Sequence, residues 1–512
     1  MAQGFIRNDD AAARTGAILA AVAVVQLLVS LDLSIVNVAL PDIADGLKFS
    51  ASGLAWVIHA YALTFGGLLL LGGKSADVFG RRRMLVIGLA VFAGASLLAG
   101  AAGTPGQLIA ARGLQGVGAA AMQPASLAVL AVSFPGGRAR ARAFGIWSAV
   151  NALGAALGVV LGGSVTEYAG WRWVMFLNVP VALAAIALTR NAIPRDHLPE
   201  RTHSPDVAGG LLSTAGMTLL VYGIVRTAHA GWVSPATLLS LAGAVIALTG
   251  FVFVERVPRR DPLLRLGLLT NRNVAGSNLF NLLVGAAMAS CFYFVSLYLQ
   301  LVLGHAPASA GIMFMPFALG VIVGAGISVK LGYRLSHRKL LIVGALVTSS
   351  GFAWFGTMSA GGTFLTDVLG PSLVASVGFG LCLGPVVSTA TDGVDGTETG
   401  MASGLLASAR QIGASLGLAV LGTIAQYRIG TQSGASALSL GFGLGMTVGA
   451  GMLILAAIVA AFVLPRCTDS SVFRAHDNVW KPHGSHTSAA TDRASEIRTR
   501  APQGVQQPTD DD

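Results

Sequence analysis

Long apolar runs recur along the whole chain, separated by short segments that hold charged residues, proline or glycine. Alternation of period two, which a membrane barrel requires, is absent, so helices are the only spanning element left. A helix that crosses a bilayer needs about 20 consecutive apolar residues. Division of the runs at charges, proline and glycine predicts fourteen such helices. They are expected at residues 16–40, 52–73, 84–103, 106–133, 143–164, 173–190, 207–227, 236–255, 274–302, 309–331, 339–360, 366–389, 402–426 and 440–464.

The overall composition supports a membrane protein built of helices. Of 512 residues, 54% are hydrophobic and only 11% are charged, whereas a soluble domain carries about 25% charged residues. A mean hydropathy of +0.71 leaves more apolar surface than one water-soluble core can bury. The lipid bilayer is therefore the first expected partner, and the predicted fold class is all-α.

The two ends of the chain differ from the apolar middle. Residues 1–15 are expected to form a cytoplasmic arm, and the tail at 466–512, rich in Ser, Thr, Asp and Pro, a disordered cytoplasmic segment. The first apolar run is too long for a cleavable signal and contains Asp32, so it predicts a first spanning helix.

The distribution of basic residues predicts the orientation. If the amino terminus is cytoplasmic, 27 of the 33 Lys and Arg fall on the cytoplasmic side and only four outside. Cytoplasmic loops carry such an excess. The net charge of +10 therefore indicates orientation and requires no nucleic-acid partner. The bias towards Arg, Ala and Gly suggests a GC-rich bacterial genome. We therefore expect a bacterial inner-membrane protein, and the basic residues predict that both of its termini lie on the cytoplasmic side.

An internal repeat indicates two related bundles. A shift of 259 residues places the fifth predicted helix on the thirteenth, so that Gly154 and Gly158 coincide with Gly413 and Gly417. Parallel repeats of this kind build the two halves of many transporters. The predicted organisation is a six-helix bundle at 16–190, two inserted helices at 207–256 and a second six-helix bundle at 274–465.

The segment after the second predicted helix combines glycines, an acid and a run of arginines. Asp77, at the end of a helix, could pair with a basic residue across the bundle and hold one conformation. The alternative is an ordinary positively charged loop. The residues of this candidate latch are Gly73, Asp77, Gly80, Arg81, Arg82 and Arg83.

Asp32 is the one carboxylate well inside a predicted helix, and acids inside a membrane are functional candidates. At 1.5 Å per residue it lies about 12 Å from the outer face, while Arg112 lies about 9 Å and His59 about 10 Å deep. We predict that Asp32 and Arg112 form a proton switch, the alternative being a static buried ion pair. His59 is a candidate relay, although a lone helix histidine is more often a packed hydrogen-bonding group.

Several motifs together resemble those of the major facilitator superfamily. The segment Gly73 to Arg83 looks like its motif A, and Arg112-Gly-Leu-Gln115-Gly116-Val-Gly118 looks like motif B. The stretch Leu31 to Pro41 resembles the first-helix motif of its drug:proton antiporters. The likeness covers about residues 15–465 and is greatest to the fourteen-helix EmrB/QacA branch. It implies two pseudo-symmetric six-helix bundles, two inserted helices and export of amphipathic organic molecules in exchange for protons.

One motif departs from that pattern. The antiporters' motif C has Gly-Pro before its last glycine pair, but here the fifth predicted helix has Val159 in place of the proline. Four glycines remain at the spacing of a smooth packing face. They are Gly154, Gly158, Gly162 and Gly163.

The substrate cavity should be apolar with a few polar groups. Arg410 has no carboxylate at its depth, so substrate, backbone carbonyls or acids of the neighbouring loop are its candidate partners. A polar stripe on the first helix, Gln26, Ser30, Ser34 and Asn37, lines either this cavity or a helix contact. The candidate cavity residues are Asn37, Asn281, Phe292, Tyr293, Tyr298, Gln300 and Arg410.

Other functional classes find little support. The sequence has no nucleotide-binding loop, metal-ligand cluster or nucleophile–base pair, so we expect a secondary transporter without cofactor or metal, not an enzyme or a receptor. A monomer is expected by resemblance. A proton-coupled uptake permease for a small organic nutrient stays open, because it would share the fold and Val159 weakens the antiporter signature.

Overall fold

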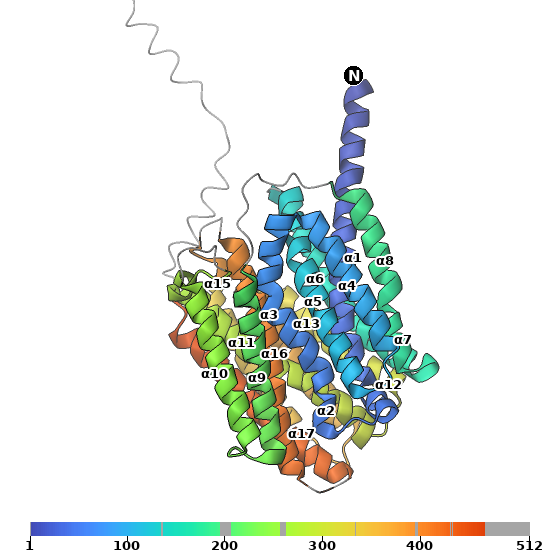
Figure 1. Cartoon of the computed structure of the whole chain (residues 1–512), viewed down its shortest axis with the longest axis vertical. Coiled ribbons are helices and arrows are strands. Elements are labelled where there is room, and N and C mark those ends of the chain that lie inside the picture. Colours follow the sequence, from blue (N-terminus) through green and yellow to red (C-terminus); the bar gives the residue numbers. More distant parts are fainter. Residues whose placement is uncertain are drawn as a thin grey trace, which may run out of the picture. The chain divides into compact units, whose positions relative to one another are not determined.

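The computed structural model describes residues 2–134, 137–194, 206–256, 263–332, 334–394, 398–430, 432 and 434–465. Helices make up nearly all of this part, and it contains no strand (Figure 1). The predicted tail at 466–512 lies outside the described residues. The chain up to Pro465 clusters as one compact unit.

The helices up to residue 194 are called the first half here. They are α1 (Ala2–Leu47), α2 (Ala51–Leu54), α3 (Trp56–Phe79), α4 (Arg81–Gly100), α5 (Pro105–Ser133), α6 (Gly137–Ala169), α7 (Trp171–Phe176) and α8 (Asn178–Ala192). Two helices follow, α9 (Val207–Ala230) and α10 (Pro235–Glu255).

The remaining helices are called the second half. They are η1 (Leu266–Thr270), α11 (Arg272–Leu297), η2 (Tyr298–Val302), α12 (Pro307–Met313), α13 (Met315–Leu331), α14 (His337–Phe355), η3 (Phe364–Leu369), α15 (Gly370–Thr391), α16 (Thr399–Ile429) and α17 (Ala435–Phe462). Of these short segments, η1 is a 3₁₀-helix, whereas η2 and η3 are π-helical.

Every one of the fourteen predicted apolar segments corresponds to a helix or to a pair of consecutive helices. Thirteen stretches within the described residues are long and apolar enough to cross a membrane. The eleventh predicted segment became α14, which is not among the thirteen. Its 19 residues begin with His337, Arg338 and Lys339, so a shorter part of it is apolar. The division into two bundles and two inserted helices stays a prediction.

The end of the first helix was predicted wrongly. The sequence suggested an end at residue 40, before Pro41, but α1 runs from Ala2 to Leu47 with Pro41 inside it. The apolar stretch of α1 begins at Thr15, and the cytoplasmic arm at 1–15 stays a prediction. Proline lacks the N–H that would bond the carbonyl four residues earlier, here that of Asn37. A helix tolerates this loss in a membrane where a neighbouring group satisfies the freed carbonyl.

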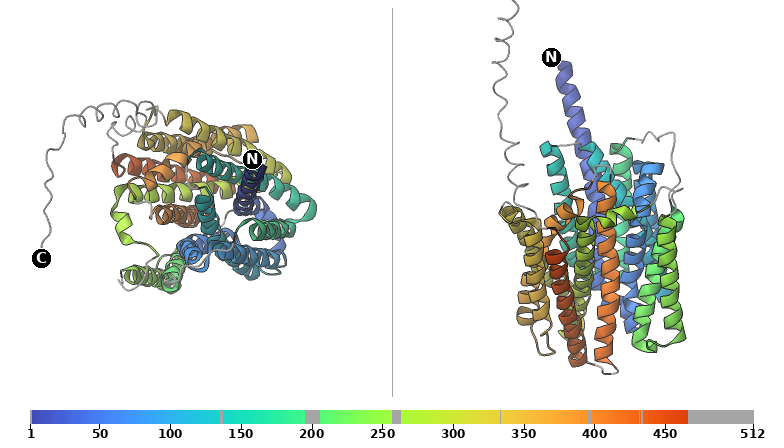
Figure 2. Two further views of the ribbon diagram at one scale, coloured as in Figure 1. Left: turned by 90° about the horizontal axis from the view of Figure 1, so that it is seen from above. Right: turned by 90° about the vertical axis from the view of Figure 1, so that its left-hand side faces the viewer.

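The same pair of helices packs together in each half. α1 packs along α6, and α11 packs along α16, with glycines at both contacts. Figure 2 shows the helix bundle from above and from the side. α9 and α10 pair with each other, and α9 also contacts α3 and α16.

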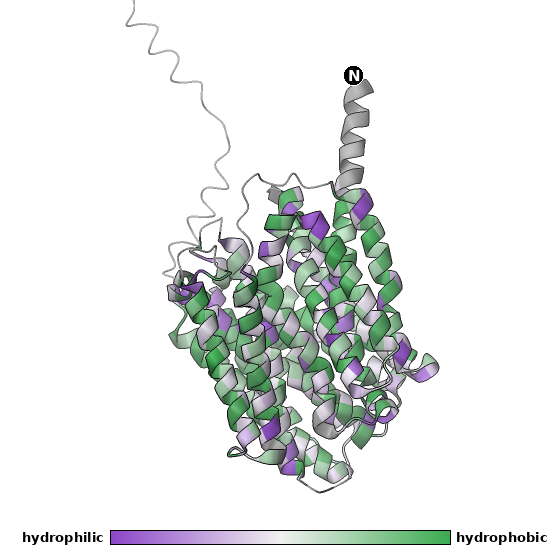
Figure 3. Ribbon diagram, in the orientation of Figure 1, coloured by the Kyte–Doolittle hydropathy of each residue, from purple (hydrophilic) through white to green (hydrophobic). Residues whose placement is uncertain are grey.

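The outer surface of the helices is apolar. α10 exposes large hydrophobic side chains such as Leu239, Ile246 and Phe253. Figure 3 shows hydrophobic residues along the length of the helices and hydrophilic ones gathered near their ends. This is the surface of a multi-pass membrane protein, because lipid tails take the place of water around it. We call the face at which α1 begins the amino-terminal face, and the opposite one, where α2 lies, the far face (Figure 1).

Candidate functional site

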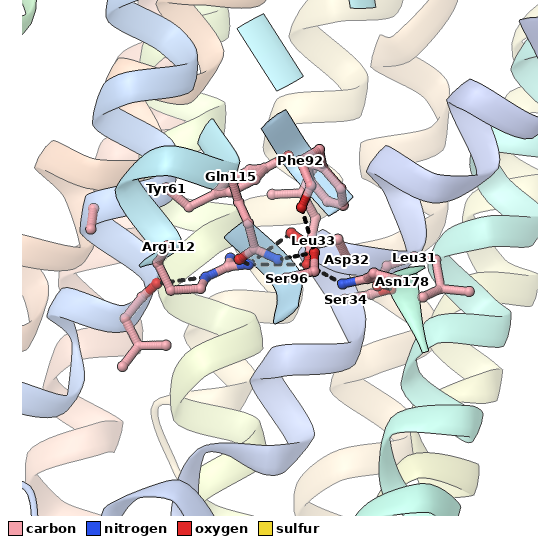
Figure 4. A network of polar contacts seen from close by, with 12 residues as sticks. Leu31, Asp32, Leu33, Ser34, Tyr61, Phe92, Ser96, Arg112, Gln115 and Asn178 are labelled. Carbon is pink, nitrogen blue, oxygen red and sulfur yellow. Dashed lines mark hydrogen bonds and ion pairs between the residues drawn. The ribbon is translucent and has the colours of Figure 1, made fainter. Parts of the chain in front are cut away.

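A buried ion pair lies at the centre of the first half (Figure 4). Nη1 of Arg112 donates to both carboxylate oxygens of Asp32, at 3.0 and 2.8 Å. The side chains are 2% and 0% exposed, respectively. Nδ2 of Asn178 donates to the same carboxylate at 2.8 Å. Three helices, α1, α5 and α8, therefore meet at one acid inside the membrane-spanning part.

Arg112 is also held by groups other than Asp32. The same Nη1 donates to Oε1 of Gln115 at 2.8 Å, and Nε donates to the carbonyl of Val57 at 3.1 Å. The guanidinium carbon lies 4.5 Å from the centroid of the Tyr61 ring, a cation–π contact. The arginine thus has partners on α3 and α5 that persist if the acid is neutralised.

The hydrogen-bonded chain continues from Gln115 into α4. Nε2 of Gln115 donates to Oγ of Ser96 at 2.7 Å, and that hydroxyl donates to the carbonyl of Phe92 at 2.8 Å. Two predicted glycines make the approach possible. A Cβ at Gly116 would lie 2.5 Å from the carbonyl oxygen of Tyr61, and one at Gly118 would lie 2.8 Å from that of Gly88. The motif B residues therefore bring α5 against α3 and α4.

His59 lies elsewhere, although its estimated depth was similar. Its Nδ1 is 3.0 Å from Oγ of Ser415 on α16, and its ring meets Trp56 edge-on at 5.5 Å between centroids. The side chain is fully buried, and Nε2 has no hydrogen-bond partner among the described residues. The structure thus places His59 between the two halves and not in the network of Asp32.

The glycines of α6 form the contact with α1. A Cβ at Gly154 would lie 2.9 Å from Cβ of Ser30, and one at Gly158 would lie 2.7 Å from the carbonyl oxygen of Leu31. Gly162 lies against Ile35 in the same way, whereas Gly163 faces Pro307 of α12. The motif C-like face therefore sets the distance between α1 and α6 without the proline.

The polar stripe of α1 belongs to this helix contact. Nε2 of Gln26 and Oγ of Ser30 both donate to Oδ1 of Asn151 on α6, each at 2.6 Å. The hydroxyl of Ser34 bonds within α1 to the carbonyl of Ser30 at 3.0 Å. The stripe was predicted to line either the cavity or a helix contact. Gln26, Ser30 and Ser34 lie at the helix contact.

The candidate latch after α3 is paired locally. Gly80 has a φ of 94°, a left-handed conformation that suits glycine, and it joins α3 to α4. Oδ1 of Asp77 lies 3.8 Å from Nη2 of Arg81 across this turn. The predicted partner of Asp77 was instead a basic residue on the other side of the bundle. Nη2 of Arg82 donates to the carbonyl of Arg190 at the end of α8. Gly73 faces Pro124 of α5, and Arg83 is exposed in the first turn of α4.

The two halves are joined near the far face by hydrogen bonds from α11 and η2 to α1. Oγ of Ser296 donates to the carbonyl of Asn37 at 2.7 Å, and Nε2 of Gln300 donates to the carbonyl of Val38 at 2.9 Å. The Asn37 carbonyl is the one that Pro41 leaves without its helical donor. The amide of Asn37 itself bonds to Leu33 within α1. The Asn37 carbonyl and the Gln300 side chain therefore connect the halves, and neither residue lines the cavity described next.

A cavity of about 300 Å³ lies between the halves near the far face. It is bounded by α1, α2 and α3 on one side, α11, α16 and α17 on the other, and Val225 of α9. Of the seven predicted cavity residues, Tyr293 lines it. His59, which was predicted for proton coupling, lines it as well.

The other predicted cavity residues pack within the second half. Nδ2 of Asn281 donates to the carbonyl of Leu406 at 2.8 Å. Phe292 packs on Phe314 and Phe317. The hydroxyl of Tyr298 donates to Oδ2 of Asp367 at 2.9 Å and to a carbonyl. Arg410, on α16, is partly buried and makes no hydrogen bond or ion pair with the described residues.

Two functional positions were not singled out from the sequence. They are Asn178, which bonds to Asp32, and Ser296, which bonds to the Asn37 carbonyl. Asn178 is the first residue of α8, and its signal was a polar amide at the start of an apolar run. Ser296 precedes Gln300 by four residues, so both face the same side of the helix.

The match to a family model is extensive. The model described as Major Facilitator Superfamily matches residues 22–418. The chain belongs to the Major Facilitator Superfamily.

Curated members of the superfamily align over most of the chain. The cephamycin export protein CmcT of Amycolatopsis lactamdurans is 38% identical over 467 residues, which cover 91% of this chain and 95% of that protein. The puromycin resistance protein pur8 of Streptomyces alboniger is 38% identical over 458 residues, covering 87% and 90%. This chain is therefore a membrane transporter of the major facilitator type.

Solved structures of the superfamily share the fold. The POT family transporter PepTSo superposes with a TM-score of 0.64 at 14% identity, over 88% of this chain and 97% of that one. At this identity the likeness concerns the fold alone. It agrees with the all-α major facilitator arrangement that the sequence predicted.

Proposed function

We propose that this transporter exports amphipathic organic compounds across the bacterial inner membrane in exchange for protons. The observation that carries the proposal is the buried Asp32–Arg112 pair, a titratable group inside the membrane-spanning part with an arginine already in place. The names of two relatives, an export protein and a resistance protein, favour outward transport of such compounds. We propose a secondary active transporter, driven by the proton gradient, that works as a monomer. It is proposed to have no nucleic-acid partner.

The basic residues support the orientation. With the amino-terminal face in the cytoplasm, 27 of 33 Lys and Arg lie inside. We place both termini in the cytoplasm on this ground. The far face, with the cavity and the bonds from Ser296 and Gln300, is then the outer face of the membrane.

The proton step follows from the partners of Asp32. A proton on the carboxylate removes the charge that binds the guanidinium, so the strong charge-assisted bonds become ordinary ones. Arg112 keeps Gln115, the Val57 carbonyl and the Tyr61 ring. Protonation therefore loosens α1 from α3 and α5 while the arginine stays in place. Because α1 also packs on α6 and bonds to α11, its movement would reach the contact between the halves.

The bonds between the halves should control opening towards the outside. Ser296→Ala removes the donor to the Asn37 carbonyl, and one such bond changes an equilibrium by about fivefold. We expect the outward-open population to rise by about that factor. Double electron–electron resonance between spin labels on the outer loops measures it. Ser290→Ala is the matched control, because its hydroxyl bonds to Ala286 within the same helix. Equal distance distributions in both variants would remove this role from Ser296.

The direction of transport is tested in inside-out membrane vesicles. With an acidic interior, vesicles that contain the protein should accumulate a fluorescent organic cation such as ethidium, and a protonophore should release it. Vesicles without the protein serve as the reference. Accumulation that ignores the protonophore would contradict proton exchange. Uptake into intact cells driven by an inward proton gradient would instead favour the nutrient symporter.

A further inference from the structure

The cavity near the far face has the features of a binding site of its own. Its volume of about 300 Å³ falls at the lower end of the range for small-molecule sites. The walls are largely apolar and include the aromatic rings of Phe49, Tyr293, Phe294 and Phe442. These rings come from both halves, so a bound molecule would contact both at once.

One of the residues that line the cavity has a polar atom without a partner. His59 is 0% exposed and lines the cavity, and its Nε2 lacks a hydrogen-bond partner among the described residues. Its other nitrogen bonds to Ser415, and its ring packs against Trp56, so the imidazole is held in one orientation. A buried polar atom left without a partner costs free energy, which a ligand's hydroxyl or amine can recover.

The rim of the cavity carries a negative charge. Asp45 and Ser50 both line the cavity and are exposed on the far side. No Lys or Arg is among the residues that line it within the described part of the chain. A carboxylate next to aromatic faces suits an organic cation, because both attract positive charge.

We propose that this cavity binds an amphipathic organic cation from the outer side, with its charge near Asp45 and its other end towards His59. The proposal rests on the proposed function only for the class of molecule. In an exporter, such a site would hold the compound last before release and expose it to the medium. The inserted helix α9 takes part, since Val225 closes one wall.

The site is tested by equilibrium binding of ethidium to the full-length protein in nanodiscs, followed by fluorescence anisotropy without any gradient. Gly422 lines the cavity, and a Cβ there would meet nothing within 4 Å, so Gly422→Leu fills the space without a clash at Cβ. We expect this variant to lose at least about tenfold in affinity, the loss of several apolar contacts. Gly94→Leu is its control, because Gly94 also has open space and does not line the cavity.

The charge is tested separately. Asp45→Asn should weaken ethidium binding about three- to fivefold at low salt, and less at high salt. Asp42→Asn removes a charge from the same helix outside the cavity and is the matched control. Unchanged binding in Gly422→Leu, or equal effects of the two Asp variants, would overturn the proposal. Binding as expected without proton-driven transport would refute the proposed function and leave the site in place.

Discussion

Asn in place of Asp32 should abolish proton-driven export, with a fall of at least about a hundredfold in ethidium accumulation by inside-out vesicles. The amide keeps the shape of the carboxylate but cannot take up or release a proton in this range of pH. Its oxygen can still accept hydrogen bonds from Arg112 and Asn178. The network is therefore weakened but stays connected. Ethidium binding without a gradient should persist.

Stability must be followed in the same experiment. Removal of one partner of a buried ion pair costs about 3–5 kcal/mol when the other charge is left uncompensated. We therefore expect a lower melting temperature for Asp32→Asn, but less than for Asp32→Ala, which lacks an acceptor for the guanidinium. Asp42→Asn, on the same helix, should leave transport intact. A folded Asp32→Asn protein that still exchanges ethidium for protons would show that the pair is static.

Ala in place of Gly158 should destabilise the protein and slow transport. The added Cβ would press on the Ser34 hydroxyl and lie 2.7 Å from the Leu31 carbonyl oxygen, and that backbone atom cannot turn aside. Overpacking of this kind costs about 1–3 kcal/mol. The displaced segment of α1 carries Asp32, so the contact with Arg112 should lengthen. The measurements are thermal unfolding in detergent and vesicle transport.

Gly145 provides the control on the same helix. A Cβ there would meet nothing within 4 Å, and alanine favours a helix over glycine by about 0.8–1 kcal/mol. Gly145→Ala should therefore leave the melting temperature unchanged or raise it. The two substitutions are chemically identical, so opposite signs would isolate the packing against α1. A melting temperature that rises equally in both would mean that α1 and α6 adjust without cost.

Hydropathy predicted the places of the helices because the bilayer imposes one length and one composition on them. The repeat between Gly154 and Gly413 also has a structural counterpart. Gly158 packs on α1, and Gly417 packs on α11 against Ala286. The estimate of depth brought Asp32 and Arg112 together correctly because every residue of an α-helix adds the same rise along its axis.

Depth alone could not predict which side of a helix a residue faces. His59 and Arg112 have similar depth, but His59 points to α16, a contact set by Ser415 far along the chain. The sequence also suggested that Pro41 ends the first helix. It continues because Ser296 of the other half satisfies the carbonyl that the proline frees. Partners distant in sequence decide such cases, and no local pattern contains them.

The position of α9 bears on how a hydrophobic compound reaches the interior. Ser213 bonds to the carbonyl of Gly67 on α3, and Thr423 of α16 bonds to the carbonyl of Ile224 on α9. Between Ser213 and Ile224, α9 therefore lies over the seam where α3 meets α16. A molecule dissolved in the lipid would meet α9 there and could not enter between α3 and α16. Sideways entry from the lipid would then have to use the opposite seam, where α6 meets α12 and α13. Hydrophobic compounds would therefore enter from the lipid on one side of the protein only.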